Sequence, residues 1–146
     1  MSFSLSELLQ EVFTELGQMQ VSTATGGGND YVTDSKMANT GGKDDVWKNG
    51  AVFIIEDAGG AGVAPEGEFR LITAYDDATG KFTVESNFSA QPALGDIFGI
   101  VSEYYPLYTM IELANAGLRS LGDVALVDTA TLDTASGQTE YAAALA

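Results

Sequence analysis

Neither cysteine nor histidine occurs among the 146 residues of the chain. Without cysteine there are no disulfides, no thiolate nucleophiles and no zinc–thiolate sites. Without histidine the chain lacks the side chain that most often transfers protons near neutral pH. Any reaction would have to rely on carboxylates, lysine and tyrosine. We therefore predict that the protein is not an enzyme and has no catalytic residues, no cofactor and no metal site.

Basic residues are also scarce. Six Lys and Arg stand against 21 Asp and Glu, which gives a formal net charge of −15. A field of that sign repels phosphate backbones and anionic lipid surfaces. No apolar run approaches the roughly 20 residues that a membrane-spanning helix needs. The sequence therefore predicts no direct contact with nucleic acid and none with membranes.

The composition is otherwise that of a folded domain. Hydrophobic residues make up 45% of the chain and aromatic residues 10%. A chain of this length buries most of its apolar surface without the help of disulfides or metals. We expect a single α+β domain over residues 1–146.

A first helix is predicted at residues 4–16. Ser4 and Glu7 have the spacing of a capping box, in which each side chain accepts a hydrogen bond from the other residue's backbone N–H. Gly17 is suited to the left-handed conformation that ends many helices. Apolar residues recur at helical spacing on one face, which is predicted to be buried: Leu5, Leu8, Leu9, Val12, Phe13 and Leu16.

A second helix is predicted at residues 106–121. Pro106 suits a first helical position, because its fixed φ and missing N–H cost nothing there. The chain beyond this helix, residues 123–146, is interpreted as an extended segment of one or two edge strands around a loop. An apolar stripe along the helix is predicted to be a core face: Leu107, Met110, Ile111, Ala114, Leu118 and Leu121.

The β-rich region between the helices is residues 20–104. Residues 20–45 are interpreted as an edge strand and a long loop, because β-prone pieces at 21–25 and 31–33 are separated by Gly, Asn and Asp. Three or four further strands are predicted to form the core sheet, in segments rich in β-branched or aromatic residues: residues 51–56, 69–75, 81–85 and 96–102.

The segment DDATG, residues 76–80, has the turn residues of an antiparallel hairpin, with Gly80 suited to a positive φ. Phe82 and Val84 are then predicted to share the buried face, with Thr83 on the other. The expected fold is an antiparallel sheet or barrel-like core of about five to seven strands, flanked by the two helices.

Carboxylates and glycine-rich runs are the remaining candidates for chemistry. An enzyme would have to use carboxylates such as Asp57, Asp77 and Asp96, alone or with a metal, and no base is positioned beside them. The runs GGGND at 26–30 and EDAGGAG at 56–62 have neither the spacing of a nucleotide loop nor that of a calcium hand. We interpret both runs as flexible loops.

Four residues are predicted to lie in subunit interfaces: Trp47, Tyr31, Tyr141 and Leu126. Trp47 follows a charged loop, and tryptophan is enriched at the energetic centres of interfaces. Tryptophan is also highly buried on average, so this residue could equally cover the edge of the sheet. Both interpretations of Trp47 remain open on the sequence.

Two stretches resemble proteins of tailed-phage particles. In FRLITAYDDATGKFTVESNFSAQPALGDIFGIV, residues 69–101, a strand, a YD-x-x-TG turn, an F-T-V strand, a loop and a G-D-x-F strand follow in order. In LANAGLRSLGDVALVDTATLDTASGQTEYAAAL, residues 113–145, an N-x-A-L-R-x-L-G helix end precedes a Thr-rich loop and Q-T-E-Y. Gly117 departs from this pattern, which more often has a better helix former there.

The resemblance implies a non-enzymatic structural subunit of a tailed-phage virion, such as a neck, adaptor, tail or capsid-associated component. Its expected partners are copies of itself in a ring or lattice and other virion proteins. Its expected location is the virion, after synthesis in the host cytoplasm. The alternative is a stand-alone β-rich binding module that recognises a carbohydrate or receptor through its loops, with or without calcium.

Overall fold

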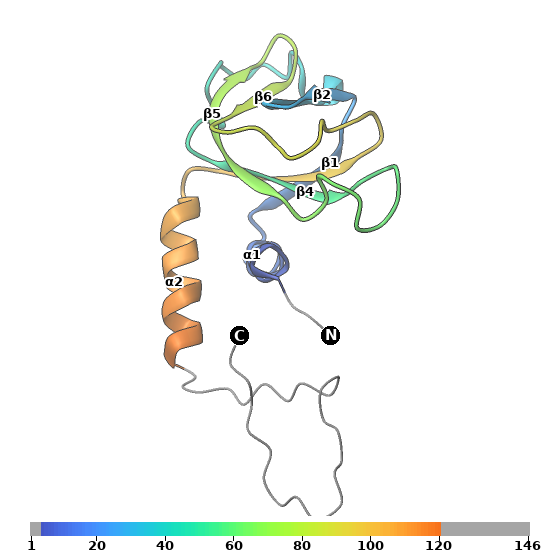
Figure 1. The fold of residues 1–146 in the computed structure, drawn as a ribbon. Helices are drawn as coiled ribbons and strands as arrows, with labels where there is room; N and C mark the ends of the chain where they lie inside the picture. The colour runs from blue at the N-terminus through green and yellow to red at the C-terminus, as the bar shows by residue number, and fades with distance from the viewer. Residues whose placement is uncertain (1–3, 121–146) are drawn as a thin grey trace, which may run out of the picture.

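The computed structural model describes residues 4–120, which form a curled antiparallel sheet with two helices on one side of it (Figure 1). The helices are α1 (Leu5–Glu15) and α2 (Leu107–Ser120). The predicted α+β class is confirmed, whereas the extended segment predicted at 123–146 lies outside the described residues. The seven strands are β1 (Met19–Thr23), β2 (Gly26–Gly28), β3 (Tyr31–Thr33), β4 (Ala51–Glu56), β5 (Phe69–Asp76), β6 (Lys81–Val84) and β7 (Ile97–Val101).

The ends of α1 confirm the predicted caps. The Oγ of Ser4 accepts a hydrogen bond from the N–H of Glu7 at 3.2 Å, and the Glu7 carboxylate accepts one from the N–H of Ser4 at 2.6 Å. These bonds, first of all the one to the backbone, lower the pKa of the Glu7 carboxyl. Gly17 adopts φ +64°, and its N–H donates to the carbonyl of Thr14 at 2.9 Å. The predicted helix 4–16 is therefore α1 with its capping residues.

The strand order is β1-β7-β4-β5-β6-β3-β2, and every neighbouring pair is antiparallel. The first strand pairs with the last, with Met19 opposite Val101. β1 and β2 stand at the two ends of this order but are separated in sequence only by Ala24 and Thr25, so the sheet has to curl. It is not closed into a barrel, because β1 and β2 are not neighbours in the described sheet.

The segment predicted as an edge strand and a long loop, residues 20–45, contains more regular structure than expected. The glycines Gly26–Gly28 form β2, which pairs with β3, and Ser35–Met37 form a short 3₁₀ turn, η1. A Cβ on Gly27 would lie 2.6 Å from the carbonyl oxygen of Pro92, so any side chain at this position would clash with Pro92. The flexible-loop interpretation of this glycine run is therefore wrong for β2.

The four predicted core strands correspond to β4, β5, β6 and β7, which are neighbours in the sheet. The predicted hairpin between β5 and β6 is confirmed, with Gly80 at φ +63°. Phe82 and Val84 are buried, as predicted, while Thr83 is only half-buried. The local turn chemistry thus sets the register of this hairpin.

Apolar side chains are buried on both faces of the sheet. The hollow of the curled sheet encloses one cluster, and α1 covers a second cluster on the outer face (Figure 1). The inner cluster includes Val32, Val52, Ile54, Ile72, Tyr75, Phe82, Phe98 and Ile100. The outer cluster is formed by Leu9, Phe13, Ala51, Phe53, Val101 and Leu107.

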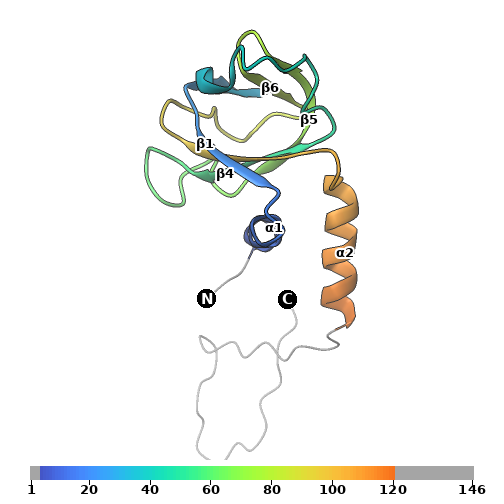
Figure 2. The same ribbon diagram turned by 180° about the vertical axis from the view of Figure 1, so that it is seen from behind.

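The second helix contacts the sheet mainly through its first turns. Leu107 is 2% exposed, and the hydroxyl of Tyr108 donates a hydrogen bond to the Glu85 carboxylate at 2.5 Å. This bond raises the pKa of the Tyr108 hydroxyl. From there α2 runs away from the sheet (Figure 2). No described helix is long and apolar enough to cross a membrane.

Candidate interaction site

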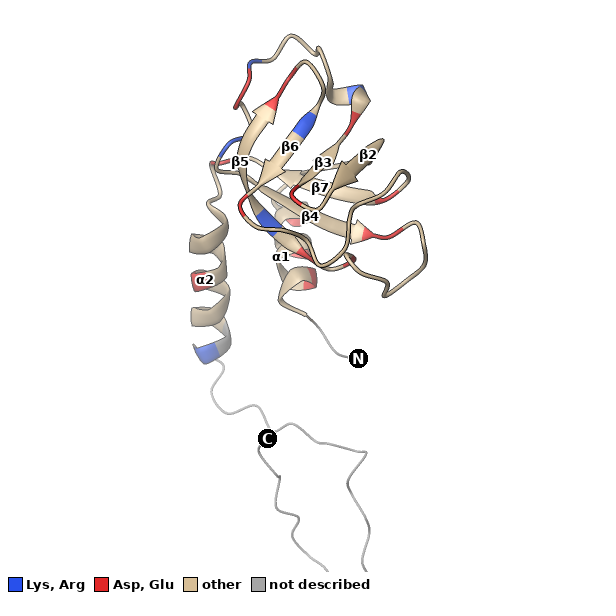
Figure 3. Cartoon of the chain, turned by 45° about the horizontal axis from the view of Figure 1, so that its top comes forward, with Lys and Arg blue, Asp and Glu red and all other residues tan. Residues whose placement is uncertain are grey.

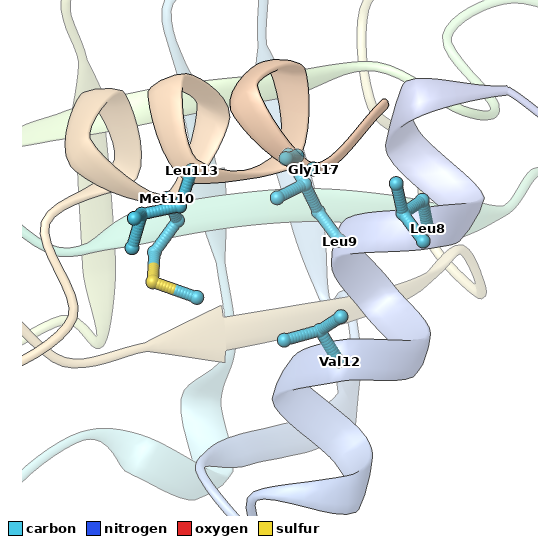
Figure 4. A pocket seen from close by; sticks show the side chains of 7 residues that line it. Leu8, Leu9, Val12, Met110, Leu113 and Gly117 are labelled. Atoms are coloured by element: carbon cyan, nitrogen blue, oxygen red, sulfur yellow. The ribbon is translucent and has the colours of Figure 1, made fainter. Parts of the chain in front are cut away.

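An apolar cleft lies between α1 and α2, with a volume of about 380 Å³. Figure 4 shows side chains from both helices converging on it. Among the described residues no polar side chain lines the cleft, so this part of the chain can accept apolar groups there but offers them no side-chain hydrogen bond. It is lined by Leu8, Leu9 and Val12 of α1 and by Met110, Leu113, Ala114 and Gly117 of α2.

The wall formed by α1 is fixed by packing against the sheet. Leu9 is 1% exposed and Phe13 is fully buried. The rings of Phe13 and Phe53 pack edge-on, with 5.7 Å between their centres. These contacts hold one face of α1 on the outer cluster. The neighbouring face, with Leu8 and Val12, is left only half-buried at the cleft.

The wall formed by α2 is far more exposed. Leu113 is 60% exposed, Ala114 is half-buried, and a Cβ added to Gly117 would meet nothing within 4 Å. A leucine left in water forgoes roughly 1.5–3 kcal/mol relative to full burial. Of the stripe predicted as a core face, Leu107 is buried, whereas Met110, Ile111 and Ala114 are only half-buried.

Acidic side chains stand beside the cleft. Glu11 and Glu15 are exposed on α1 and follow Leu8 at helical spacings of three and seven residues, so they flank its side of the cleft. Arg119, in the last turn of α2, is the only basic residue on the two helices. Glu7 on α1 and Glu112 on α2 are exposed as well, and the other acidic residues of the described chain lie on the sheet and loops (Figure 3). An occupant with a basic group beside apolar ones would match this site.

The sequence predicted a different interface residue, Trp47. Its side chain is half-buried and packs edge-on against Phe82, with 6.4 Å between ring centres. It therefore covers the inner cluster, as the sheet-edge interpretation expected. Its remaining surface lines a shallow, partly polar hollow together with Val46 and Tyr104, which is 84% exposed. A role of Trp47 in an interface stays a prediction.

Of the other three predicted interface residues, only Tyr31 belongs to the described chain, and it does not line the cleft. Tyr31 lies on β3, where the Nζ of Lys81 stands 4.2 Å from the centre of its ring. Lys81 precedes the inward-facing Phe82 on β6, so Tyr31 lies on the opposite side of the sheet from the surface that Trp47 covers. Leu126 and Tyr141 lie outside the described residues.

The three carboxylates considered for catalysis bind the protein's own backbone or a neighbouring hydroxyl. Asp96 is fully buried and accepts hydrogen bonds from the N–H groups of Ala58 and Ala93 at 2.9 and 2.8 Å. Asp57 accepts one from the N–H of Gly59 at 2.6 Å. The carboxylate of Asp77 accepts a longer bond of 3.3 Å from a threonine hydroxyl. These contacts are those of side chains that fasten loops.

The described residues do not form a metal site either. Within residues 4–120, no three His, Cys, Asp or Glu side chains are placed to hold a metal ion. The second glycine run, 56–62, lies mostly in turns after β4, and its Asp57 bonds to its own loop. The described part of the chain therefore presents a binding cleft and no assembled set of reactive groups.

The cleft itself was not predicted. The apolar stripes of both helices were recognised, but each was assigned to the core, and Leu113 was not part of the predicted stripe on α2. The one available signal was the pair of small residues in the second predicted helix, Ala114 and Gly117, which permit close packing. No protein-family model, no curated protein and no solved structure matches this chain.

Proposed function

We propose that the protein is a non-enzymatic structural subunit of a tailed-phage virion, as a neck, adaptor, tail or capsid-associated component. It acts through interfaces with copies of itself, in a ring or lattice, and with other virion proteins. The observation that carries the interface role is the apolar cleft between α1 and α2, with Leu113 60% exposed. The resemblance of residues 69–101 and 113–145 to virion proteins supports the setting.

An interface role suits the physical character of the helices. A helix gains most of its stability from packing an apolar face, and α2 packs mainly its first turns. Exposed apolar surface rimmed by charge is typical of sites where proteins associate. The carboxylates that an enzyme would need are occupied in fastening loops, which favours a structural role over a catalytic one.

The experiment that tests this function is the native mass of the full chain, measured by light scattering across salt concentration. The charge of −15 opposes self-association at low ionic strength. Between about 0.1 M and 1 M salt the Debye length falls from roughly 10 to 3 Å. We expect rings or larger assemblies that grow over this range. A strict monomer at every salt and protein concentration would contradict self-assembly.

A second candidate function, the stand-alone binding module, is favoured by the hollow beside Trp47. There an aromatic surface from Trp47 and Tyr104 lies next to the carboxylates of Asp45 and Glu103. Such a mixture suits a carbohydrate or a receptor loop. Its test is binding of bacterial surface polysaccharides, with and without calcium, to the monomer. Affinity that is lost in Trp47→Ala and kept in Leu113→Gln would favour this module.

A further inference from the structure

We propose that β1 pairs antiparallel with β1 of a second copy of this chain, about a two-fold axis through Val21. The pairing joins two sheets edge to edge through main-chain hydrogen bonds. The inference rests on the proposed function and narrows it, because it assigns self-association to one strand and one register. Three features of β1 support it: its open edge, the direction of its backbone groups and side chains, and its lack of charge.

The outer edge of β1 is open in the described part of the chain. β1 stands at one end of the strand order and has a single strand neighbour, β7. Beyond that ladder, the backbone of residues 19–23 forms no further backbone–backbone hydrogen bond within residues 4–120. Folded proteins usually protect a sheet edge with charged residues, proline or a bulge, and β1, with the sequence MQVST, has none of these.

The edge at the other end of the sheet is different. β2 is partly covered by the loop before β7, because the carbonyl oxygen of Gly27 accepts a hydrogen bond from the Gln91 side chain at 2.6 Å. A Cβ on Gly27 would also clash with Pro92 of the same loop. Of the two ends of the described sheet, β1 is therefore the one that can accept a further strand.

The backbone groups of alternate residues in β1 point away from β7. The N–H of Ala24 donates to the carbonyl of Asp96 at 2.8 Å, which continues the register in which Thr23 lies opposite Ile97. Hydrogen-bonded and non-bonded pairs alternate along an antiparallel ladder. The N–H and C=O groups of Met19, Val21 and Thr23 therefore point outward.

A two-fold axis through Val21 makes these outward groups complementary to themselves. Val21 then lies opposite Val21 of the second copy, and Met19 lies opposite Thr23. Each such pair exchanges two N–H···O=C bonds. A register shifted by two residues would leave one outward-facing residue of each strand without a partner, so the axis at Val21 uses the strand most fully.

The side chain of Val21 gains burial in the same arrangement. Ser22 donates a hydrogen bond to the buried Asp34, so its side chain faces the inner side of the sheet. Val21 therefore faces the outer side, where its neighbour on β7 is Gly99, which has no side chain to shield it. Val21 is 56% exposed. Pairing brings two β-branched side chains together across the axis, a favourable cross-strand contact.

The lack of charge selects a second copy as the partner. A two-fold pair sets like residues near each other, so a charged strand would oppose like charges. Residues 16–29 contain no Asp, Glu, Lys or Arg and form the longest such stretch of a chain with a formal charge of −15. A basic partner, which that charge attracts, would gain nothing from an uncharged strand. Two copies of this acidic chain can meet at β1 without carboxylates in the paired strands.

The exposed charges around β1 include both signs. Glu15 ends α1, Glu56 ends β4, and Lys36 lies on η1, whose Met37 contacts the Gln20 side chain. Salt screens these charges and the remaining acidic surface. Pairing through β1 is therefore expected to strengthen as the salt concentration rises.

Disulfide trapping tests the register, because the natural chain has no cysteine. Val21→Cys places two thiols opposite each other at the axis, where paired Cα atoms lie about 5.5 Å apart, within the range that a disulfide spans. The matched control is Thr23→Cys, an exposed position on the same strand. Its two copies would lie four residues apart along the paired strands, about 13 Å. At high salt with a copper–phenanthroline catalyst, we expect several-fold more disulfide-linked dimer from Val21→Cys.

A matched pair of lysine substitutions provides the second readout. Val21→Lys sets two ammonium groups against each other at the axis, and Val63→Lys makes the same change of charge at a loop residue that is 48% exposed. Both chains should fold, as judged by circular dichroism. We expect Val21→Lys to raise the protein concentration at half-assembly by about tenfold or more, the range of an interface centre. Val63→Lys should leave it close to that of the natural chain.

The outcomes separate the inference from the proposed function. Assembly that grows with salt but lacks either the excess of Val21→Cys disulfide or the effect of Val21→Lys would overturn the inference and leave the structural-subunit proposal standing. That is also the result expected if a different strand occupied this edge. A strict monomer under all conditions would overturn both. Both effects together, with the two controls silent, would support both.

Discussion

Replacing Asp96 with asparagine is expected to destabilise the domain by about 2–3 kcal/mol, although the side chains have the same shape. The carboxylate is fully buried, and its two oxygens accept hydrogen bonds from the N–H groups of Ala58 and Ala93. A hydrogen bond to a charged group contributes roughly 1.5–3 kcal/mol. An asparagine keeps one acceptor oxygen but turns its NH₂ group toward the other N–H, which then loses its hydrogen-bond partner and faces another donor.

The assay is urea unfolding followed by the fluorescence of Trp47, the only tryptophan of the chain, which packs against the inner cluster. With a slope of about 1–3 kcal/mol per molar urea, the expected loss lowers the midpoint by roughly 0.7–3 M. The matched control is Asp30→Asn, because Asp30 is exposed and its carboxylate has no hydrogen-bond partner among the described residues. The control should lie within about 0.5 kcal/mol of the natural chain.

The result also bears on function. If Asp96 were an active-site carboxylate held in an unfavourable setting, its replacement would leave stability unchanged or raise it, at the expense of activity. A value for Asp96→Asn equal to that of Asp30→Asn, with an unchanged slope, would refute the argument that Asp96 fastens the loops after β4 and before β7. The enzyme alternative would then need new consideration.

Three further predictions concern the sheet. Gly80→Ala should lower the free energy of unfolding by about 2 kcal/mol more than Gly62→Ala, as measured by urea unfolding, which is of the order of an overpacking penalty. Both glycines have a positive φ, but only a Cβ at Gly80 would clash with the carbonyl oxygen of Asp34. Equal losses of stability in the two variants would refute this explanation. Phe82→Ala should lower the free energy of unfolding by about 3–5 kcal/mol, since its buried ring joins three aromatic contacts. Burial, and then neighbouring carboxylates, raise the pKa of the Tyr75 hydroxyl above 10.0. The Tyr75 hydroxyl therefore contributes its full share of stability below pH 10.0, and this contribution is lost as the pH rises through the folded-state pKa. Tyr75→Phe should reduce this alkaline loss of stability, as measured by thermal unfolding at a series of pH values.

Much of the fold could be predicted from interactions between residues that are close in the sequence. Ser4, Glu7 and Gly17 define the ends of α1 through contacts within a few residues, so the sequence alone reveals them. The same holds for the β5–β6 hairpin, where Gly80 fixes the turn and Phe82 the buried face. Such signals depend on neighbours in the chain and on no distant partner.

Features that depend on distant residues were missed or left open. β2 is a strand because Thr33 and its neighbours on β3 pair with it, and its glycines carry no side-chain pattern. Trp47 was left between two interpretations, since its contact with Phe82 arises only when the sheet curls. The cleft required both helices to be placed on the sheet. An apolar stripe at helical spacing predicts that a face is covered, but it does not say how much of that face the chain itself covers.

The pairing of the first strand with the last has a consequence for the order of folding. α1 packs on β4 and β7, and β7 is also the partner of β1. During synthesis the amino-terminal helix therefore emerges long before the strands that bury Leu9 and Phe13 are complete. Contacts between such distant segments form slowly and leave apolar surface exposed in the meantime. The helical side of the molecule should be the last part to become native, so premature contacts between chains are expected to begin there.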